Sequence, residues 1–158
     1  SVGFDTLCRR GELVSISIED LTRTANGRYT VLVRRAKNDP EGTGRIAHLS
    51  SQSTVLIDSW LEKMGAVRGP LLRPVYGRRV SALHLTPAAV SRILKRITAK
   101  ALEGNVSTMV SGHSLRVGAA QQLTLDGKGI LQIMRAGGWR SMNVVARYVE
   151  NMDVDVWG

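Results

Sequence analysis

The sequence predicts an α+β fold in which most of the chain is helical and a small three-stranded antiparallel sheet lies near the N-terminus. Two observations predict this class. Short strand-like segments separated by turn signals occupy residues 16–49, as in antiparallel sheets. After residue 53, apolar residues recur at helical spacing instead. With 158 residues, the chain has the size of one ordinary domain and can bury a core without disulfides or metals.

The N-terminal elements follow from local patterns. A first helix is predicted over residues 4–14, whose apolar residues recur at helical spacing. Residues 16–18 alternate between isoleucine and serine and predict a first strand. Asn26-Gly27 is a strong hairpin signal before a second strand over residues 29–35. Residues 45–49 form the predicted third strand.

Two helices are predicted after the sheet. In a helix over residues 53–64, one side would carry Val55, Leu56, Trp60 and Leu61. Leu85-Thr86-Pro87 predicts a helix start, with Thr86 as the N-cap and Pro87 as the first helical residue. The residues expected on the buried side of this second helix are Val90, Ile93, Leu94, Ile97 and Ala101.

Three more helices are predicted toward the C-terminus. The first covers residues 113–126 and is ended by Gly127. A short helix over residues 130–136 stops at Gly137-Gly138. Ser141 caps the last helix, which carries Tyr148.

The charge of the chain indicates a polyanionic partner. It has 22 Lys and Arg against 13 Asp and Glu, a formal net charge of +9. Residues 68–100 contain eight of these cations and no acid, whereas an ordinary solvated surface mixes both signs. No apolar run approaches the ~18 residues of a spanning helix, so nucleic acid is favoured over a membrane. A single cysteine, Cys8, excludes an internal disulfide, and the three histidines are too scattered to predict a metal site.

One group of residues near the C-terminus has the side chains to hold an oxyanion and to transfer a proton. In Ser111-Gly112-His113-Ser114-Leu115-Arg116, the histidine and the arginine are three residues apart and project from one helix face. A histidine can transfer a proton there while an arginine holds an oxyanion. Trp139, after Gly137-Gly138, adds an N–H group that only donates. Tyr148 supplies a hydroxyl that these groups could surround.

These motifs, in this order, resemble the tyrosine recombinase (phage integrase) family, and within it the Cre-type recombinases. Residues 5–13, Asp-Thr-Leu-Cys-Arg-Arg-Gly-Glu-Leu, are similar to the first arginine block of the family. The resemblance covers residues 5–152. It implies that residues 1–158 are a recombinase catalytic domain, a fragment without the family's N-terminal DNA-binding domain.

The resemblance implies a role for each motif residue. Tyr148 would attack the scissile phosphate and form a 3′-phosphotyrosyl bond. Arg9 and Arg116 would hold the non-bridging oxygens, and Trp139 would donate to them in a position where most members have histidine. His113 would help to take the proton of the tyrosine.

Two further residues complete the implied site. Lys37 would be the general acid for the 5′-oxygen, on the hairpin that follows the second strand. Glu12 would orient the other groups without touching DNA. The resemblance implies no cofactor and no metal.

We also expect a set of DNA-binding residues and a mode of assembly. The partner would be double-stranded DNA. The protein would be a monomer alone and a tetramer on DNA when full-length, in the bacterial cytoplasm or nucleoid with a phage or mobile-element origin possible. The DNA-binding residues would be Arg34, Arg35, Arg92, Lys95, Arg96 and Lys100.

Two alternative functions stay open. The short helices around Gly137-Gly138 could form a helix-turn-helix in a DNA-binding module without catalysis. A type IB topoisomerase resembles this family in its active-site chemistry and would relax DNA without a special site. Each motif residue alone also has an ordinary structural role, such as a surface charge for Arg9 or a core anchor for Trp139.

Overall fold

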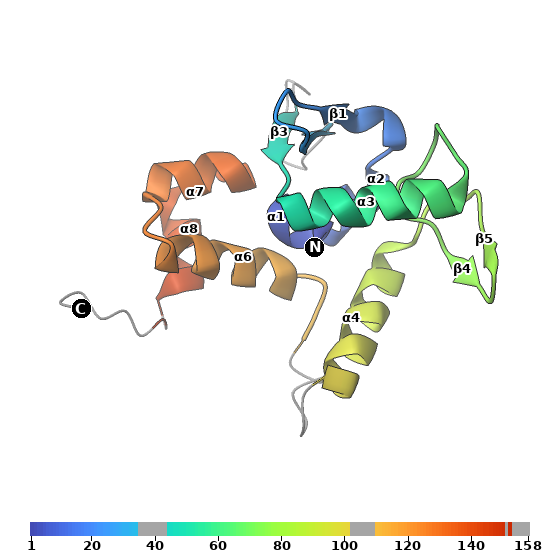
Figure 1. Cartoon of the computed structure of the whole chain (residues 1–158). Helices are drawn as coiled ribbons and strands as arrows, with labels where there is room; N and C mark the ends of the chain where they lie inside the picture. The colour runs from blue at the N-terminus through green and yellow to red at the C-terminus, as the bar shows by residue number, and fades with distance from the viewer. Residues whose placement is uncertain (35–43, 102–109, 151, 153–158) are drawn as a thin grey trace.

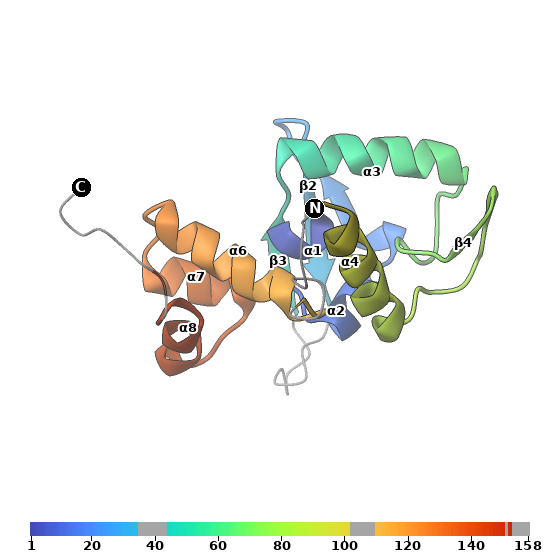
Figure 2. The same ribbon diagram turned by 90° about the horizontal axis from the view of Figure 1, so that it is seen from below.

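The computed structural model describes residues 1–34, 44–101, 110–150 and 152. Its α+β class agrees with the prediction from the sequence. Figures 1 and 2 show α6, α7 and α8 grouped at one end of the molecule, with the β4–β5 hairpin at the other. The elements are α1 (Val2–Asp5), α2 (Arg10–Ser15), the 3-10 helix η1 (Ile18–Asp20), β1 (Leu21–Arg23), β2 (Tyr29–Val33), β3 (Arg45–His48), α3 (Ser51–Met64), β4 (Val75–Tyr76), β5 (Arg79–Val80), α4 (Pro87–Ala101), α6 (Ser114–Leu125), α7 (Ile130–Gly137) and α8 (Met142–Val149).

The predicted three-stranded antiparallel sheet is present in the order β1-β2-β3. Val31 of β2 is its centre, because it pairs with Leu21 on one side and Ala47 on the other. The prediction of a first strand at residues 16–18 is wrong. The Asp20 carboxylate accepts the backbone N–H of Ser17 at 2.9 Å, which closes η1 before the first strand begins.

The prediction of one helix over residues 4–14 is also wrong, because the chain breaks between α1 and α2. The Glu12 carboxylate accepts the backbone N–H of Arg9 at 2.9 Å and so caps the start of α2. Leu7, in the break, has a φ of 50°, in the left-handed region that non-glycine residues rarely adopt. This break positions the candidate site.

Both long helices start where capping residues occur. The Ser50 hydroxyl accepts the N–H of Ser53 at the start of α3, and the Thr86 hydroxyl accepts that of Ala89 at the start of α4, as predicted. The expected buried side of each helix is partly wrong, and in α3 the buried side is rotated by tertiary packing. Val55 and Leu56 are exposed, and Ile57 is buried instead.

In α4, Val90 is buried as expected, but Ile97 is 56 % exposed and Ala101 is exposed too. The helix packs against α2 through its first half, where Arg10 donates to the Ser91 hydroxyl at 3.4 Å. The second half extends beyond this contact, as Figure 1 shows. No helix in the described part of the chain is long and apolar enough to cross a membrane.

The buried apolar residues form two clusters. The larger one lies among the sheet, α2, α3 and α4, and includes Val31 and Leu71. The smaller one joins α6, α7 and α8 to Leu7 and contains Trp139 and Val145. The predicted motif residues lie where these two clusters meet, because α1 packs against α6 there.

Candidate active site

Arg116 is the centre of the site. It lies in the first turn of α6, and its side chain is fully buried, with 0 % relative exposure. Its Nη1 donates to the backbone carbonyl of Leu7. Its Nε and Nη2 are buried and have no hydrogen-bond partner in the described residues. Unpaired buried donors are rare in native proteins, so these two N–H groups are free to hold an anion.

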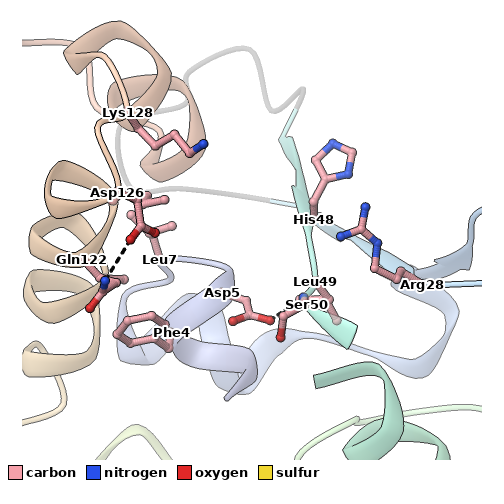
Figure 3. Close-up of a pocket in the computed structure, with 12 residues that line it drawn as sticks. Phe4, Asp5, Leu7, Arg28, His48, Leu49, Ser50, Gln122, Asp126 and Lys128 are labelled. Atoms are coloured by element: carbon pink, nitrogen blue, oxygen red, sulfur yellow. Dashed lines mark hydrogen bonds between the residues drawn. The ribbon is translucent and has the colours of Figure 1, made fainter. Parts of the chain in front are cut away.

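The carbonyl that anchors Arg116 comes from the break between α1 and α2. A continuous helix would have used the Leu7 carbonyl for its own ladder, but the left-handed turn directs it to α6. The Leu7 side chain lines a cavity of about 520 Å³ between α1, the end of β3 and α6 (Figure 3). Leu7 therefore belongs to both places, since its carbonyl binds Arg116 in the site and its side chain lines this cavity.

Arg9 and Glu12 form the second part of the site. Arg9 Nη1 donates to Glu12 Oε1 at 2.7 Å, and the other carboxylate oxygen caps the Arg9 backbone. The Glu12 side chain is 7 % exposed, whereas that of Arg9 is 37 % exposed. A buried carboxylate thus fixes a guanidinium whose other face reaches solvent.

Trp139 closes one side of Arg116. The Cζ atom of Arg116 lies 4.0 Å from the centre of the indole ring, a cation–π contact. The ring packs over Gly137, where a Cβ atom would come within 2.1 Å of it. Gly138 ends α7 in the left-handed conformation and turns the chain so that Trp139 enters the site.

His113 and Tyr148 meet across the site. Nε2 of His113, the N-cap residue of α6, lies 3.1 Å from the Tyr148 hydroxyl of α8. The Tyr148 ring also lies 5.6 Å from the ring of Trp139, measured between centroids. The Gln121 side chain donates to the Tyr148 carbonyl at 3.0 Å and fixes the end of α8. The phenol is therefore held from both sides.

Burial and the nearby charges change the pKa values of His113 and Arg116. Burial lowers the pKa of His113, and the positive charges of Arg116 and Arg9 lower it further. Burial also lowers the pKa of Arg116 to about 10, with a smaller effect of Arg9 and an opposing effect of Glu12. His113 is thus favoured in its neutral form, which can accept a proton.

An open cavity of about 360 Å³ lies on the side of the site formed by Arg9 and His113. Its lining includes Arg9, Arg10 and His113, together with Ser111 and Gly112. The arrangement offers an oxyanion several N–H donors next to a hydroxyl and a neutral imidazole, so it could stabilise developing negative charge and take up a proton. No group of three or more His, Cys, Asp or Glu side chains in the described residues is arranged to hold a metal ion.

The structure brings six of the predicted site residues together: Arg9, Glu12, His113, Arg116, Trp139 and Tyr148. Lys37 and Arg35 lie outside the described residues. Arg34 is exposed, but its Nε is paired with the buried Asp20. The other predicted DNA-binding residues are exposed on α4: Arg92, Lys95, Arg96 and Lys100.

Sequence reasoning did not identify Gln121, the Leu7 carbonyl or Arg45. No local pattern marks them, because their partners are distant in sequence: Gln121 bonds residue 148, and Leu7 bonds residue 116. Arg45 of β3 donates to the Thr6 carbonyl at 2.6 Å. Only the folded chain shows these contacts.

The chain is similar in sequence to a known protein family and to known proteins. The phage integrase family model matches residues 2–154. The recombinase cre of Escherichia phage P1 is 32% identical over 164 residues, covering 96% of this chain and 48% of its own length. An integrase/recombinase xerD homolog of Selenomonas ruminantium is also 32% identical, covering 97% of this chain and 46% of its own length. The chain thus spans about half the length of these curated relatives.

Solved structures have the same fold. A crystal structure of XerA recombinase has a TM-score of 0.72 at 20% identity, covering 96% of this chain and 52% of that one. XerH site-specific recombinase bound to its difH substrate has a TM-score of 0.68 at 23% identity, covering 98% of this chain and 42% of that one. At these identities the likeness concerns the fold alone.

Proposed function

Since this chain belongs to the phage integrase family, we propose that it is the catalytic domain of a tyrosine-type site-specific DNA recombinase. The longer protein would cut and rejoin double-stranded DNA through a 3′-phosphotyrosyl intermediate. The observation that carries this proposal is the 3.1 Å contact between His113 Nε2 and the Tyr148 hydroxyl beside the buried Arg116. A nucleophile, a proton acceptor and an oxyanion site adjoin one another there.

In the first step, the Tyr148 oxygen bonds to the scissile phosphorus and the bond from phosphorus to the 5′-oxygen breaks. The phenol proton passes to His113. A free tyrosine has a pKa near 10, so its ionisation at neutral pH costs ~4 kcal/mol. The neutral imidazole, 3.1 Å from the hydroxyl, would accept this proton as the bond to phosphorus forms, so Tyr148 need not ionise beforehand to act as the nucleophile.

The developing negative charge is held by the donors of the site. Nε and Nη2 of Arg116 have no other partner in the described residues, so a phosphate oxygen would satisfy both. Arg9 would hold the second non-bridging oxygen from its solvent-facing side, while Glu12 orients it. Trp139 would add its N–H group. Each such donor is worth roughly 10²–10³-fold in rate.

The leaving 5′-oxygen needs a proton, and Lys37 is the residue that we assign to supply it. Its side chain is long and cationic, and Brønsted acids of this type assist departure of an alkoxide. Rejoining is the reverse reaction, with the 5′-hydroxyl attacking the phosphotyrosine. Because the energy of the broken bond is kept, the cycle needs no ATP or metal.

DNA would lie against the basic surface of α4 and the open side of the site. The four cations of α4 are exposed and would contact phosphates, with Arg92 the candidate for reading a base edge. Arg34, which follows β2, would contact the DNA backbone, and we assign the same role to Arg35. We expect the full-length protein to be monomeric alone and tetrameric on DNA, and to act in the bacterial cytoplasm.

A trapping experiment tests this function. The full-length protein would be incubated with a duplex selected from a random-sequence library and nicked next to the cleavage position, so that the released strand diffuses away. A covalent protein–DNA adduct should accumulate and should be absent for Tyr148→Phe. An adduct that persists in that variant contradicts the proposal. DNA binding without any adduct would favour the non-catalytic module, and relaxation of plasmids that lack the selected site would favour a topoisomerase.

A further inference from the structure

Arg45 on β3 lies behind the phosphate-binding groups, outside the motif residues. Its Nη2 donates to the Thr6 carbonyl at 2.6 Å and lies 3.6 Å from the Cys8 sulfur. These two contacts flank Leu7, whose carbonyl accepts the hydrogen bond from Arg116. The Arg45 guanidinium therefore contacts both ends of the Thr6–Cys8 turn, whose middle residue binds the Arg116 guanidinium.

The same side chain also packs against the segment that carries Trp139. A Cβ atom on Gly138 would lie 3.2 Å from Cδ and Nε of Arg45, so the arginine lies directly over this glycine. The next residue, Trp139, places its ring against Arg116. Arg45 thus contacts both supports of Arg116, the Leu7 turn and the Gly138 turn.

Resting on the proposed function, we propose that Arg45 is a positioning residue that holds Arg116 in the geometry required for phosphate binding. It acts by fixing the Thr6–Cys8 turn and the Gly138 turn relative to β3. A rigid strand is a better support than either turn alone, because turns without packing partners shift easily.

The charge of Arg45 adds to this effect. Burial is the main cause of the lowered pKa of Arg116, and the positive charges of Arg9 and Arg45 lower it further, as expected for three guanidinium groups in one cluster. Glu12 is the buried acid beside them. Because like charges repel, these guanidinium groups need hydrogen bonds to stay close together. A bound phosphate would reduce the repulsion and stabilise the cluster.

The test compares Arg45→Met and Arg45→Lys with wild type in the full-length protein. Arg23→Met is the matched control, since Arg23 is an arginine of the same sheet whose partner is Asp58, away from the site. The readouts are the single-turnover cleavage rate at saturating nicked DNA, the DNA concentration at half saturation, and the hydrogen exchange of the Arg116 Nε–H in the DNA-free chain by NMR.

We expect Arg45→Met to lower the cleavage rate about 10–100-fold, as for a displacement of about 1 Å, while half saturation changes by less than about threefold. The Arg116 Nε–H should exchange at least about tenfold faster. Arg45→Lys should recover part of the rate, and Arg23→Met should match wild type. Unchanged cleavage and exchange in Arg45→Met would overturn the proposal.

A double-mutant cycle separates positioning from a general loss of structure. If Arg45 acts through Arg116, Arg45→Met should cost less than about threefold in an Arg116→Lys background. If the double variant instead loses cleavage rate by the product of the two separate losses, the proposal is contradicted. If the methionine variant does not fold, Arg45→Lys decides: slower cleavage with faster exchange supports it, and wild-type values refute it. Should wild type form no adduct, the proposed function fails, and the exchange measurement still tests the support of Arg116.

Discussion

The guanidinium of Arg116 lies over the indole of Trp139, with 4.0 Å between its Cζ atom and the ring centroid. Such contacts contribute about 0.5–2 kcal/mol, more when they are desolvated, as here. The indole also carries an N–H group, so under the proposed function Trp139 would have two separable roles: its ring supports the cation, and its N–H would donate to the phosphate.

Replacing Trp139 with phenylalanine should separate these functions. The smaller ring still lies under Arg116, so the free energy of unfolding should fall by only about 1 kcal/mol. The cleavage rate should fall by roughly 10²–10³-fold, because one donor is removed. Trp60→Phe is the control, since its indole donates to the Leu71 carbonyl at 2.7 Å, away from the site. An unchanged cleavage rate for Trp139→Phe would show that the indole only packs.

Gly137→Ala tests the space under the indole ring. The added methyl group would lie 2.1 Å from Cζ3 of Trp139, so the ring must shift from Arg116. We expect the free energy of unfolding to fall by about 1–3 kcal/mol. Gly118→Ala in α6 should instead raise it by about 0.5–1 kcal/mol, because its methyl group meets only Phe4 at 3.8 Å and alanine favours helices. Denaturant unfolding of both variants measures this difference, and equal effects would contradict it.

The pKa of His113 gives a pH-dependent prediction. It should lie below the usual 6.5, because burial and the charges of Arg116 and Arg9 disfavour the imidazolium. Between this lowered pKa and 6.5, the unfolded chain binds more protons than the folded one. This contribution to stability is therefore complete above pH 6.5 and is lost as the pH falls through that window.

NMR titration of the His113 ring protons in the DNA-free chain measures this pKa. Tyr148→Phe is a suitable control, because it keeps the ring that buries His113 and leaves both arginines in place, so the pKa should stay low. Adduct formation by wild type should also decline as the pH falls through the pKa of His113. A titration midpoint at or above 6.5 would contradict the environment described here.

The exposed cations of α4 predict the salt dependence of DNA binding. Replacing Arg92, Lys95 or Arg96 with alanine should reduce the slope of log affinity against log salt by about 0.9 for each phosphate that is no longer neutralised. Lys63→Ala at the end of α3 should leave the slope unchanged. Fluorescence anisotropy at several salt concentrations measures it. If Arg92 reads a base, its substitution should also reduce discrimination between the selected site and random DNA.

The sequence predicted the fold class and the set of motif residues because both depend on local signals. Thr86-Pro87 marks the start of α4, and Gly138 marks the end of α7, through backbone preferences that act within a few residues. Family motifs are also short and ordered, so His113, Arg116 and Tyr148 could be identified without coordinates.

The break between α1 and α2 could not be predicted in the same way. The apolar spacing of residues 4–14 is compatible with one helix, and the partners that stabilise the break are distant. Arg116 and Arg45 bond the Leu7 and Thr6 carbonyls, which are 109 and 39 positions away in the chain. Likewise, the exposure of Ile97 depends on where α4 leaves α2. Tertiary contacts determine these features, so the spacing of apolar residues in the sequence cannot predict them.

The anchor of Arg116 is a main-chain carbonyl, and every amino acid possesses one. A substitution at position 7 therefore leaves the hydrogen-bonding group in place, provided that the new residue tolerates a left-handed backbone and fills the space of the buried Leu7 side chain. A survey of orthologous sequences that looks only for invariant side chains would overlook this support, whereas the backbone dihedral would remain constant.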